Sequence, residues 1–96
     1  MGERRDLVEA NRHEIREIVR RHRGRSVSVF GSVARGDERP TSDVDFLVDF
    51  EPGSSLFDLL HVADDLEALL GVPVDVVSAG GLKERDDHIR REALPL

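Results

Sequence analysis

Three residue types that often carry structure or chemistry are absent, because the 96-residue chain has no cysteine, no tryptophan and no tyrosine. Without cysteine, neither disulfides nor thiolate metal sites are available. Without tryptophan or tyrosine, and with only four phenylalanines, the sequence indicates no aromatic platform for a nucleobase and fixes no base preference. A metal site in this chain would need ligands other than sulfur.

Long apolar runs are also missing. No stretch approaches the roughly 20 residues that span a bilayer. The charged segment from Met1 to Asp6 lacks the apolar centre of a signal peptide, so we expect a cytoplasmic protein. The patterns G-x-x-x-x-G-K-[ST] and G-x-S-x-G do not occur, which excludes a P-loop and a nucleophile elbow.

The charge balance and the length set further bounds. The net charge of −6 argues against broad nucleic-acid binding, which needs a basic surface, but leaves room for a local anion site. With 39% hydrophobic and 35% charged residues, the composition is that of a folded globular protein rather than a disordered one. We expect a single domain over residues 1–96 with a modest core.

Hydrophobic periodicity predicts alternating helices and strands. A charged amphipathic helix is expected over residues 3–23, ended by Gly24, and a second long helix begins after Ser54 or Ser55 and ends at Gly71. The other expected elements are strands over 26–30, 43–50 and 72–78, a turn or two of helix over 33–36, and a short helix over 83–93. This order predicts a small sheet with helices packed against it, in the α/β or α+β class.

The most informative pattern is Gly31-Ser32, then ten intervening residues, then Asp43-Val44-Asp45. The first pair lies where a strand passes into a helix start, which presents free N–H groups that bind phosphate. Gly31 lets a phosphate approach the backbone, and Ser32 adds a hydroxyl donor. Either half alone is commonly an ordinary turn or a solvated strand end, but together they favour a phosphate and metal site.

The two aspartates share one face of their strand, with Cα atoms about 6.6 Å apart. That spacing suits convergence on one or two divalent ions, which bridge phosphates and neutralise developing charge. Asp75, alone in the apolar run 72–77, is a third candidate ligand. If its strand lies beside strand 43–50, Asp75 completes a triad with Asp43 and Asp45 and is placed to act as general base toward an acceptor hydroxyl. An edge position facing solvent is the alternative for Asp75.

Residues 30–48 closely resemble the minimal nucleotidyltransferase (MNT) family of the DNA polymerase beta-like nucleotidyltransferase superfamily. The strand around Asp75 and the closing segment 91–96 are also similar to that family. The resemblance implies a mixed sheet of about three to four strands flanked by helices, with the three aspartates as ligands of Mg²⁺, and ATP as substrate. It also implies a partner, because members of this branch are commonly antitoxins of HEPN-domain RNase toxins, and some transfer AMP onto a tyrosine hydroxyl of the toxin.

Two other functions remain open on the sequence. The chain could be a binding antitoxin that neutralises its toxin by occupying it, or a nucleotidyltransferase for a small molecule, although relatives of the second kind usually carry an added acceptor-binding domain. One further residue has two interpretations: Arg35, one turn beyond Ser32, contacts phosphate or forms a salt bridge with Asp37 or Glu38.

Overall fold

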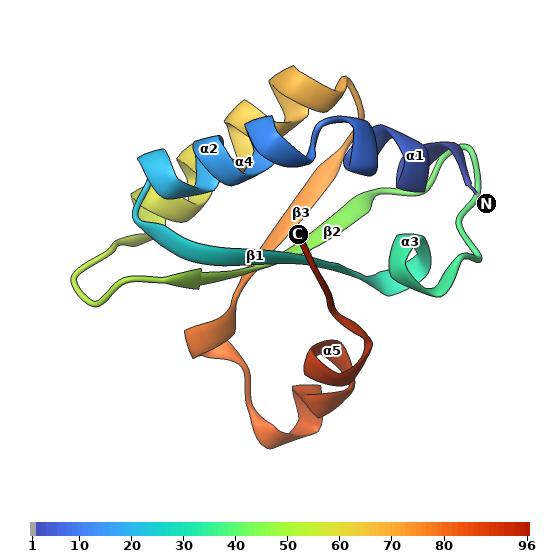
Figure 1. Cartoon of the computed structure of the whole chain (residues 1–96). Coiled ribbons are helices and arrows are strands. Elements are labelled where there is room, and N and C mark those ends of the chain that lie inside the picture. The colour runs from blue at the N-terminus through green and yellow to red at the C-terminus, as the bar shows by residue number, and fades with distance from the viewer. Residues whose placement is uncertain (1) are drawn as a thin grey trace.

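A computed structural model describes residues 2–96, within which four strands form one mixed sheet (Figure 1). The strands lie in the order β3-β2-β1-β4, with β2 parallel to β3, and with β1 antiparallel to both β2 and β4. This confirms the expected small mixed sheet. The strands are β1 (Gly24–Phe30), β2 (Val44–Phe50), β3 (Val74–Ser78) and β4 (Leu94–Pro95).

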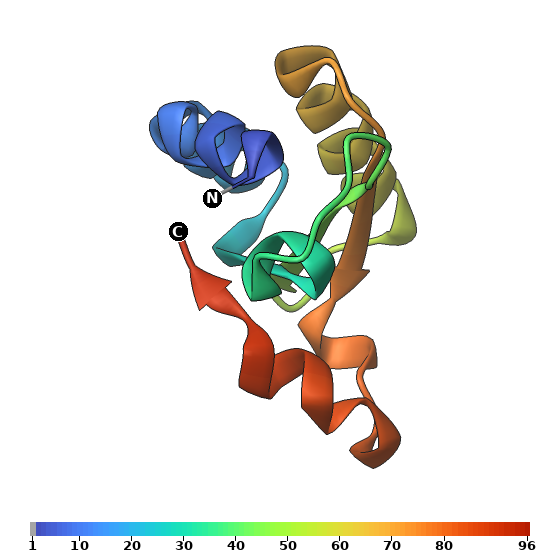
Figure 2. The same cartoon turned by 90° about the vertical axis from the view of Figure 1, so that its right-hand side faces the viewer.

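Helices lie on both sides of the sheet (Figures 1 and 2). Three of them cover one face, namely α1 (Glu3–Ala10), α2 (Arg12–Arg21) and α4 (Leu56–Leu70). The short helix α3 (Gly31–Arg35) follows β1 directly. The opposite face is crossed by a segment made of two 3-10 turns and one helix: η1 (Ala79–Gly81), η2 (Glu84–Asp86) and α5 (Asp87–Glu92). None of the helices within residues 2–96 is long and apolar enough to cross a membrane.

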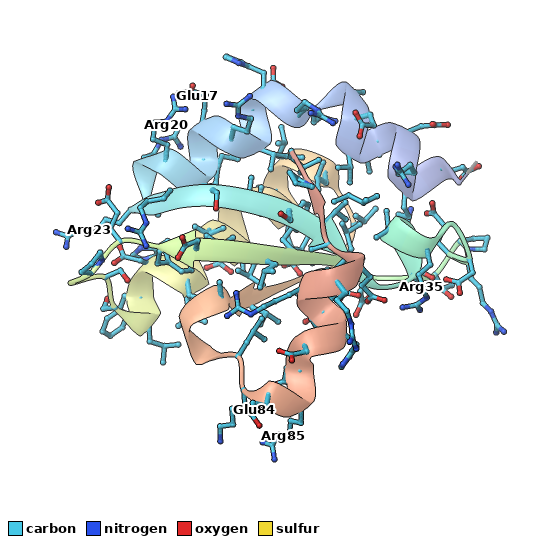
Figure 3. All side chains as sticks on the ribbon, turned by 60° about the horizontal axis from the view of Figure 1, so that its bottom comes forward. Glu17, Arg20, Arg23, Arg35, Glu84 and Arg85 are labelled. Carbon is cyan, nitrogen blue, oxygen red and sulfur yellow. The ribbon has the colours of Figure 1, made fainter. Side chains whose placement is uncertain are left out.

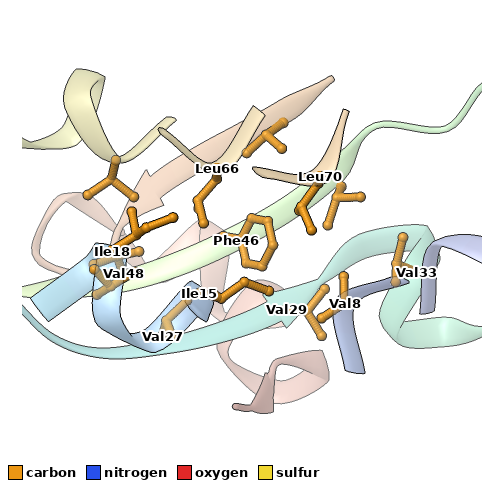
Figure 4. Close-up of a cluster of buried hydrophobic side chains, with 14 residues drawn as sticks. Val8, Ile15, Ile18, Val27, Val29, Val33, Phe46, Val48, Leu66 and Leu70 are labelled. Atoms are coloured by element: carbon orange, nitrogen blue, oxygen red, sulfur yellow. The ribbon is translucent and has the colours of Figure 1, made fainter. Parts of the chain in front are cut away.

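The core lies between the sheet and the layer of α1, α2 and α4. Strand β2 supplies its centre, because Val44, Phe46 and Val48 alternate toward the helices and are fully buried. Phe46 lies among side chains from α2 and α4, including Ile15 and Leu66 (Figure 4). The intervening residues of β2 point to the opposite face, so the packing that buries the valines also presents the aspartates on the other side.

The prediction of one helix over residues 3–23 is wrong in one respect. The segment forms two helices, α1 and α2, which are separated at Asn11. The Asn11 side chain donates a hydrogen bond from Nδ2 to the carbonyl of Leu7, at 2.9 Å. Asparagine readily competes in this way with the helical backbone, which explains the break. Both helices still contribute to the predicted apolar stripe, with Val8 from α1 and Ile15 from α2 fully buried.

The predicted role of Gly24 as the end of that helix is also wrong. Helix α2 ends at Arg21, and the residue in the left-handed conformation is Arg23, with φ of 68°. Gly24 instead begins β1 and is buried, where a Cβ atom would lie 2.2 Å from Cγ1 of Val19. The glycine is therefore required by the close packing of β1 on α2 rather than by a helix cap.

The helix expected after Ser54 or Ser55 forms as predicted. It begins at Leu56, and the backbone N–H of Ser55 donates to the carboxylate of Asp58 at 2.9 Å, which ties the first turn. Gly71 ends it in the left-handed conformation, with φ of 70°.

The C-terminal helix predicted over 83–93 is shorter than expected. The chain passes from η2 into α5, ends the helix at Glu92 and becomes extended at Ala93. Leu94 and Pro95 then pair with β1 as strand β4, which the sequence analysis did not predict. A residue that precedes proline favours extended conformations, so the Leu94-Pro95 pair indicates in the sequence that this helix ends before residue 94.

Candidate active site

The corner between β1 and α3 brings Gly31 against the second strand. Phe30 is extended, and Gly31 turns the chain with φ of 74°, a conformation that favours glycine. A Cβ atom on Gly31 would lie 2.2 Å from Oδ2 of Asp45. The absence of a side chain at position 31 is therefore what allows the start of α3 to lie next to an aspartate of β2.

The three predicted aspartates lie on neighbouring positions of β2 and β3. Asp43 directly precedes β2 and is exposed, Asp45 is the second residue of β2 and is half-buried, and Asp75 is exposed. Asp45 and Asp75 are paired directly across the parallel β2–β3 ladder, so their side chains point to the same face of the sheet. The condition set by the sequence, that the strand of Asp75 lies beside strand 43–50, is met.

The carboxylates of this group interact electrostatically. The pKa of Asp45 is raised to about 6, mainly by burial and also by the neighbouring charges of Asp75 and Asp43, while Arg35 acts in the opposite direction. Among the residues that the structure describes, Asp43, Asp45 and Asp75 form no salt bridge with a basic side chain. The site is therefore a concentration of negative charge that no direct ion pair neutralises within the described residues.

We expect Asp45→Asn to stabilise the protein in the absence of metal and nucleotide. A shift from 3.8 to about 6 corresponds to as much as ~3 kcal/mol, which solvent screening of the half-exposed carboxylate reduces to about 1 kcal/mol. The folded protein keeps the Asp45 proton up to about pH 6, whereas the unfolded chain loses it at lower pH, so stability falls as pH rises through that interval.

Denaturant unfolding of both proteins at several pH values measures this effect. The gain in the free energy of unfolding of Asp45→Asn over the wild type should be near zero below pH ~4 and complete above pH ~6. An advantage that does not change with pH, or a loss of stability at pH 7, would contradict the interaction among the three aspartates.

The donor chemistry of the cluster fits Mg²⁺. Carboxylate oxygens are the ligands that this ion prefers, and a bound cation would relieve the repulsion that raises the pKa of Asp45. Within residues 2–96, no three acidic or histidine side chains stand close enough together to form a complete metal site. Mg²⁺ in phosphoryl-transfer sites is commonly held by one or two carboxylates plus substrate phosphates, so a ready-made protein cage is not required. The roles of Asp43, Asp45 and Asp75 as metal ligands stay a prediction.

The face of the sheet that bears Asp45 and Asp75 has free space. Two residues along β2 from Asp45, Leu47 contributes to a cavity of about 330 Å³. Ser28 of β1 lines the same cavity, together with Gly80 and Arg90 of the segment that crosses this face. The cavity lies on the same face of the sheet as Asp45 and Asp75, but none of the three predicted aspartates lines it.

The structure adds one residue that the sequence analysis missed, Glu92 at the end of α5. Its Oε1 accepts a hydrogen bond from the backbone N–H of Gly31 at 3.0 Å, and both carboxylate oxygens lie 3.3 Å from Nη1 of Arg35. Figure 3 shows Arg35 beside α5. Arg35 also bonds Asp37 at 3.2 Å, and the hydrogen bonds to Asp37 and Glu92 raise its pKa. The predicted salt bridge with Asp37 is confirmed, and the signal for Glu92 was only its place in the closing segment 91–96.

The comparison with known proteins agrees with this geometry. The sequence profile described as the nucleotidyltransferase domain matches residues 12–94. The chain belongs to the nucleotidyltransferase domain family. The match extends from α2 to β4 and therefore includes the Gly31 corner, all three aspartates and Glu92.

Similar proteins support membership of the minimal branch of these nucleotidyltransferases. The protein adenylyltransferase MntA of Thermococcus cleftensis is 44% identical over 77 residues, which cover 80% of this chain and 75% of that protein. A solved minimal nucleotidyltransferase is 45% identical, with a TM-score of 0.86, and the match covers 96% of this chain and 95% of that one.

A more distant likeness concerns the fold alone. A chain in the solved complex of the tri-AMPylated Shewanella oneidensis HEPN toxin with an MNT antitoxin is 17% identical, with a TM-score of 0.68. The match covers 91% of this chain and 69% of that one. The nucleotidyltransferase fold is thus shared with a protein found in a toxin–antitoxin complex.

Proposed function

We propose that this nucleotidyltransferase transfers AMP from Mg-ATP to a tyrosine hydroxyl of a HEPN-type RNase toxin, and so acts as the antitoxin of that toxin. The observation that carries the proposal is the close approach of Asp45 to Gly31, where a Cβ atom would meet the Asp45 carboxylate. It joins a strand-to-helix corner suited to phosphate and a carboxylate pair suited to divalent metal, which are the two halves of a nucleotidyl-transfer site.

Each site residue has a role in this proposal. Asp43 and Asp45 hold the metal ions, and Asp75 holds one of them and accepts the proton of the acceptor hydroxyl. Gly31 and Ser32 hold the triphosphate, which orients the α-phosphorus toward the acceptor. Bound Mg²⁺ would supply charge neutralisation on the phosphates and on the departing pyrophosphate.

The bond changes balance without any further reactant. The acceptor oxygen forms a bond to the α-phosphorus of ATP, while the bond between that phosphorus and the bridging oxygen to the β-phosphorus breaks. Pyrophosphate leaves with the electron pair of the broken bond, and the hydroxyl proton passes to the carboxylate of Asp75. The products are the AMP ester of the acceptor and pyrophosphate.

Two observations support a protein acceptor on another chain. This chain contains no tyrosine, so a tyrosine acceptor must belong to a different molecule. The relative from Thermococcus cleftensis carries the name of a protein adenylyltransferase, and the fold recurs beside an AMPylated HEPN toxin.

The direct test is to incubate this chain with the product of the neighbouring gene, which the proposal expects to be a HEPN protein, and Mg-ATP, and to measure the intact mass of both proteins. We expect the HEPN protein to gain the mass of one or more AMP groups, with release of an equal amount of pyrophosphate. The same mixture in EDTA is the control and should give no adduct. Loss of HEPN ribonuclease activity without any added mass would favour neutralisation by binding alone and would overturn the proposal.

A further inference from the structure

Glu92 connects two parts of the chain that are far apart in sequence. It lies at the end of α5, 61 residues from Gly31, and its side chain is only 23% exposed. One carboxylate accepts the backbone N–H of Gly31 and lies against the guanidinium of Arg35. Through these contacts Glu92 holds the end of α5, and the strand β4 that follows, against the start of α3.

The two groups that Glu92 contacts are donors suited to a phosphate. A backbone N–H at a strand-to-helix corner and an arginine one turn further along both favour an anion between them. In the structure, the carboxylate of Glu92 is the anion that lies between these two donors. Glu92 is also the third acidic side chain whose charge acts on Asp45, after Asp75 and Asp43, and it disfavours the charged form of Asp45. Since the like charges of Glu92 and Asp45 repel, the hydrogen bonds from Gly31 and Arg35 are what hold the Glu92 carboxylate at this position.

We propose that Glu92 is an internal stand-in for a phosphate group of the nucleotide: it occupies the Gly31 and Arg35 donors while the site is empty, and an incoming triphosphate displaces it. This inference rests on the proposed function, because it assumes that the triphosphate binds at the Gly31 corner. The displacement frees the end of α5 from α3, so nucleotide binding loosens the segment that leads into β4. Glu92 thereby weakens the affinity for nucleotide and couples occupancy of the site to the C-terminal segment.

The competing role is structural, in which Glu92 holds the corner in a shape that binds nucleotide. The two roles predict opposite signs for Glu92→Gln. Glutamine retains an oxygen that accepts the Gly31 N–H, but it removes the negative charge and releases the charge pairing of Arg35. If Glu92 is a stand-in, the variant binds nucleotide more tightly. If Glu92 supports the corner, the variant binds nucleotide equally well or more weakly.

The experiment is calorimetric titration of the full chain with the non-hydrolysable analogue AMP-PNP and Mg²⁺, for the wild type, Glu92→Gln and Glu84→Gln. Glu84 is an exposed acidic residue of η2, so Glu84→Gln makes the same charge change away from the corner. We expect Glu92→Gln to lower Kd by about 3- to 10-fold, the size expected from removing one partly exposed like charge. Glu84→Gln should leave Kd within about twofold of the wild type.

A second measurement uses the wild type alone and does not depend on how the variant folds. Amide hydrogen exchange over residues 87–96 should become faster when AMP-PNP saturates the protein. Unchanged or slower exchange there, or a Kd that does not fall in Glu92→Gln, would overturn the stand-in role while leaving the proposed function intact. If the wild type and both variants all fail to bind AMP-PNP, the proposed function itself fails, and the inference fails with it.

Discussion

Gly31→Ala should abolish most AMP transfer while costing only moderate stability. At φ of 74°, any residue with a Cβ atom is strained by about 1–2 kcal/mol. The new Cβ atom would also lie 2.2 Å from Oδ2 of Asp45. That oxygen is at the end of a side chain that can rotate, so the fold survives by moving the carboxylate. The displaced Asp45 no longer holds the metal in place, and we expect the transfer rate to fall by at least ~10²-fold.

Gly36→Ala is the matched control for this substitution. Gly36 ends α3 with φ of 81°, and a Cβ atom there meets nothing within 4 Å. The two variants should therefore lose a similar free energy of unfolding in denaturant titrations, about 1–2 kcal/mol each. Only Gly31→Ala should lose transfer activity. Equal activity in the two variants would show that the contact between positions 31 and 45 has no part in the reaction.

The part of the site that the sequence predicted depends on local periodicity. The alternation in strand 43–50 fixes which side chains face the core, because burying Val44, Phe46 and Val48 leaves the aspartates on the opposite face. The run around Asp75 likewise indicates a strand by its composition. What periodicity alone does not give is which strands are neighbours. On the sequence alone, Asp75 joins the triad only if its strand lies beside β2, and the parallel β2–β3 pairing meets that condition.

The features that the sequence analysis missed depend on contacts between distant residues or on single side chains. The contact from Glu92 to Gly31 spans 61 residues, and no pattern near either residue specifies it. Strand β4 has only two residues, which is too short to show the alternation of a strand in the sequence. It forms by pairing with the edge of β1. The break at Asn11 comes from one side-chain hydrogen bond within a stretch whose apolar spacing reads as continuous helix.

Asp75→Asn should separate nucleotide binding from transfer. Asp75 is exposed and lies across from Asp45 on the strand at the edge of the sheet, where an acceptor on another protein can reach it. If it takes the proton of the acceptor hydroxyl, its loss should lower the transfer rate by roughly 10²- to 10⁴-fold. Asp43 and Asp45 remain to hold Mg-ATP, so Kd for AMP-PNP should change by less than about tenfold.

Asp49→Asn is the matched control for that prediction. Asp49 lies on the same face of the sheet, four residues along β2 from Asp45, and its carboxylate pairs with the exposed Arg25 at 3.3 Å. Removing that surface ion pair should cost at most ~1 kcal/mol of stability and leave the transfer rate unchanged. Quench-flow measurement of adduct formation and calorimetric titration with AMP-PNP give the two quantities for each variant. If Asp75→Asn loses nucleotide binding and transfer in equal proportion, Asp75 acts as a metal ligand in the ground state. If it loses neither, the third aspartate has no part in the reaction, and the two carboxylates of β2 act alone.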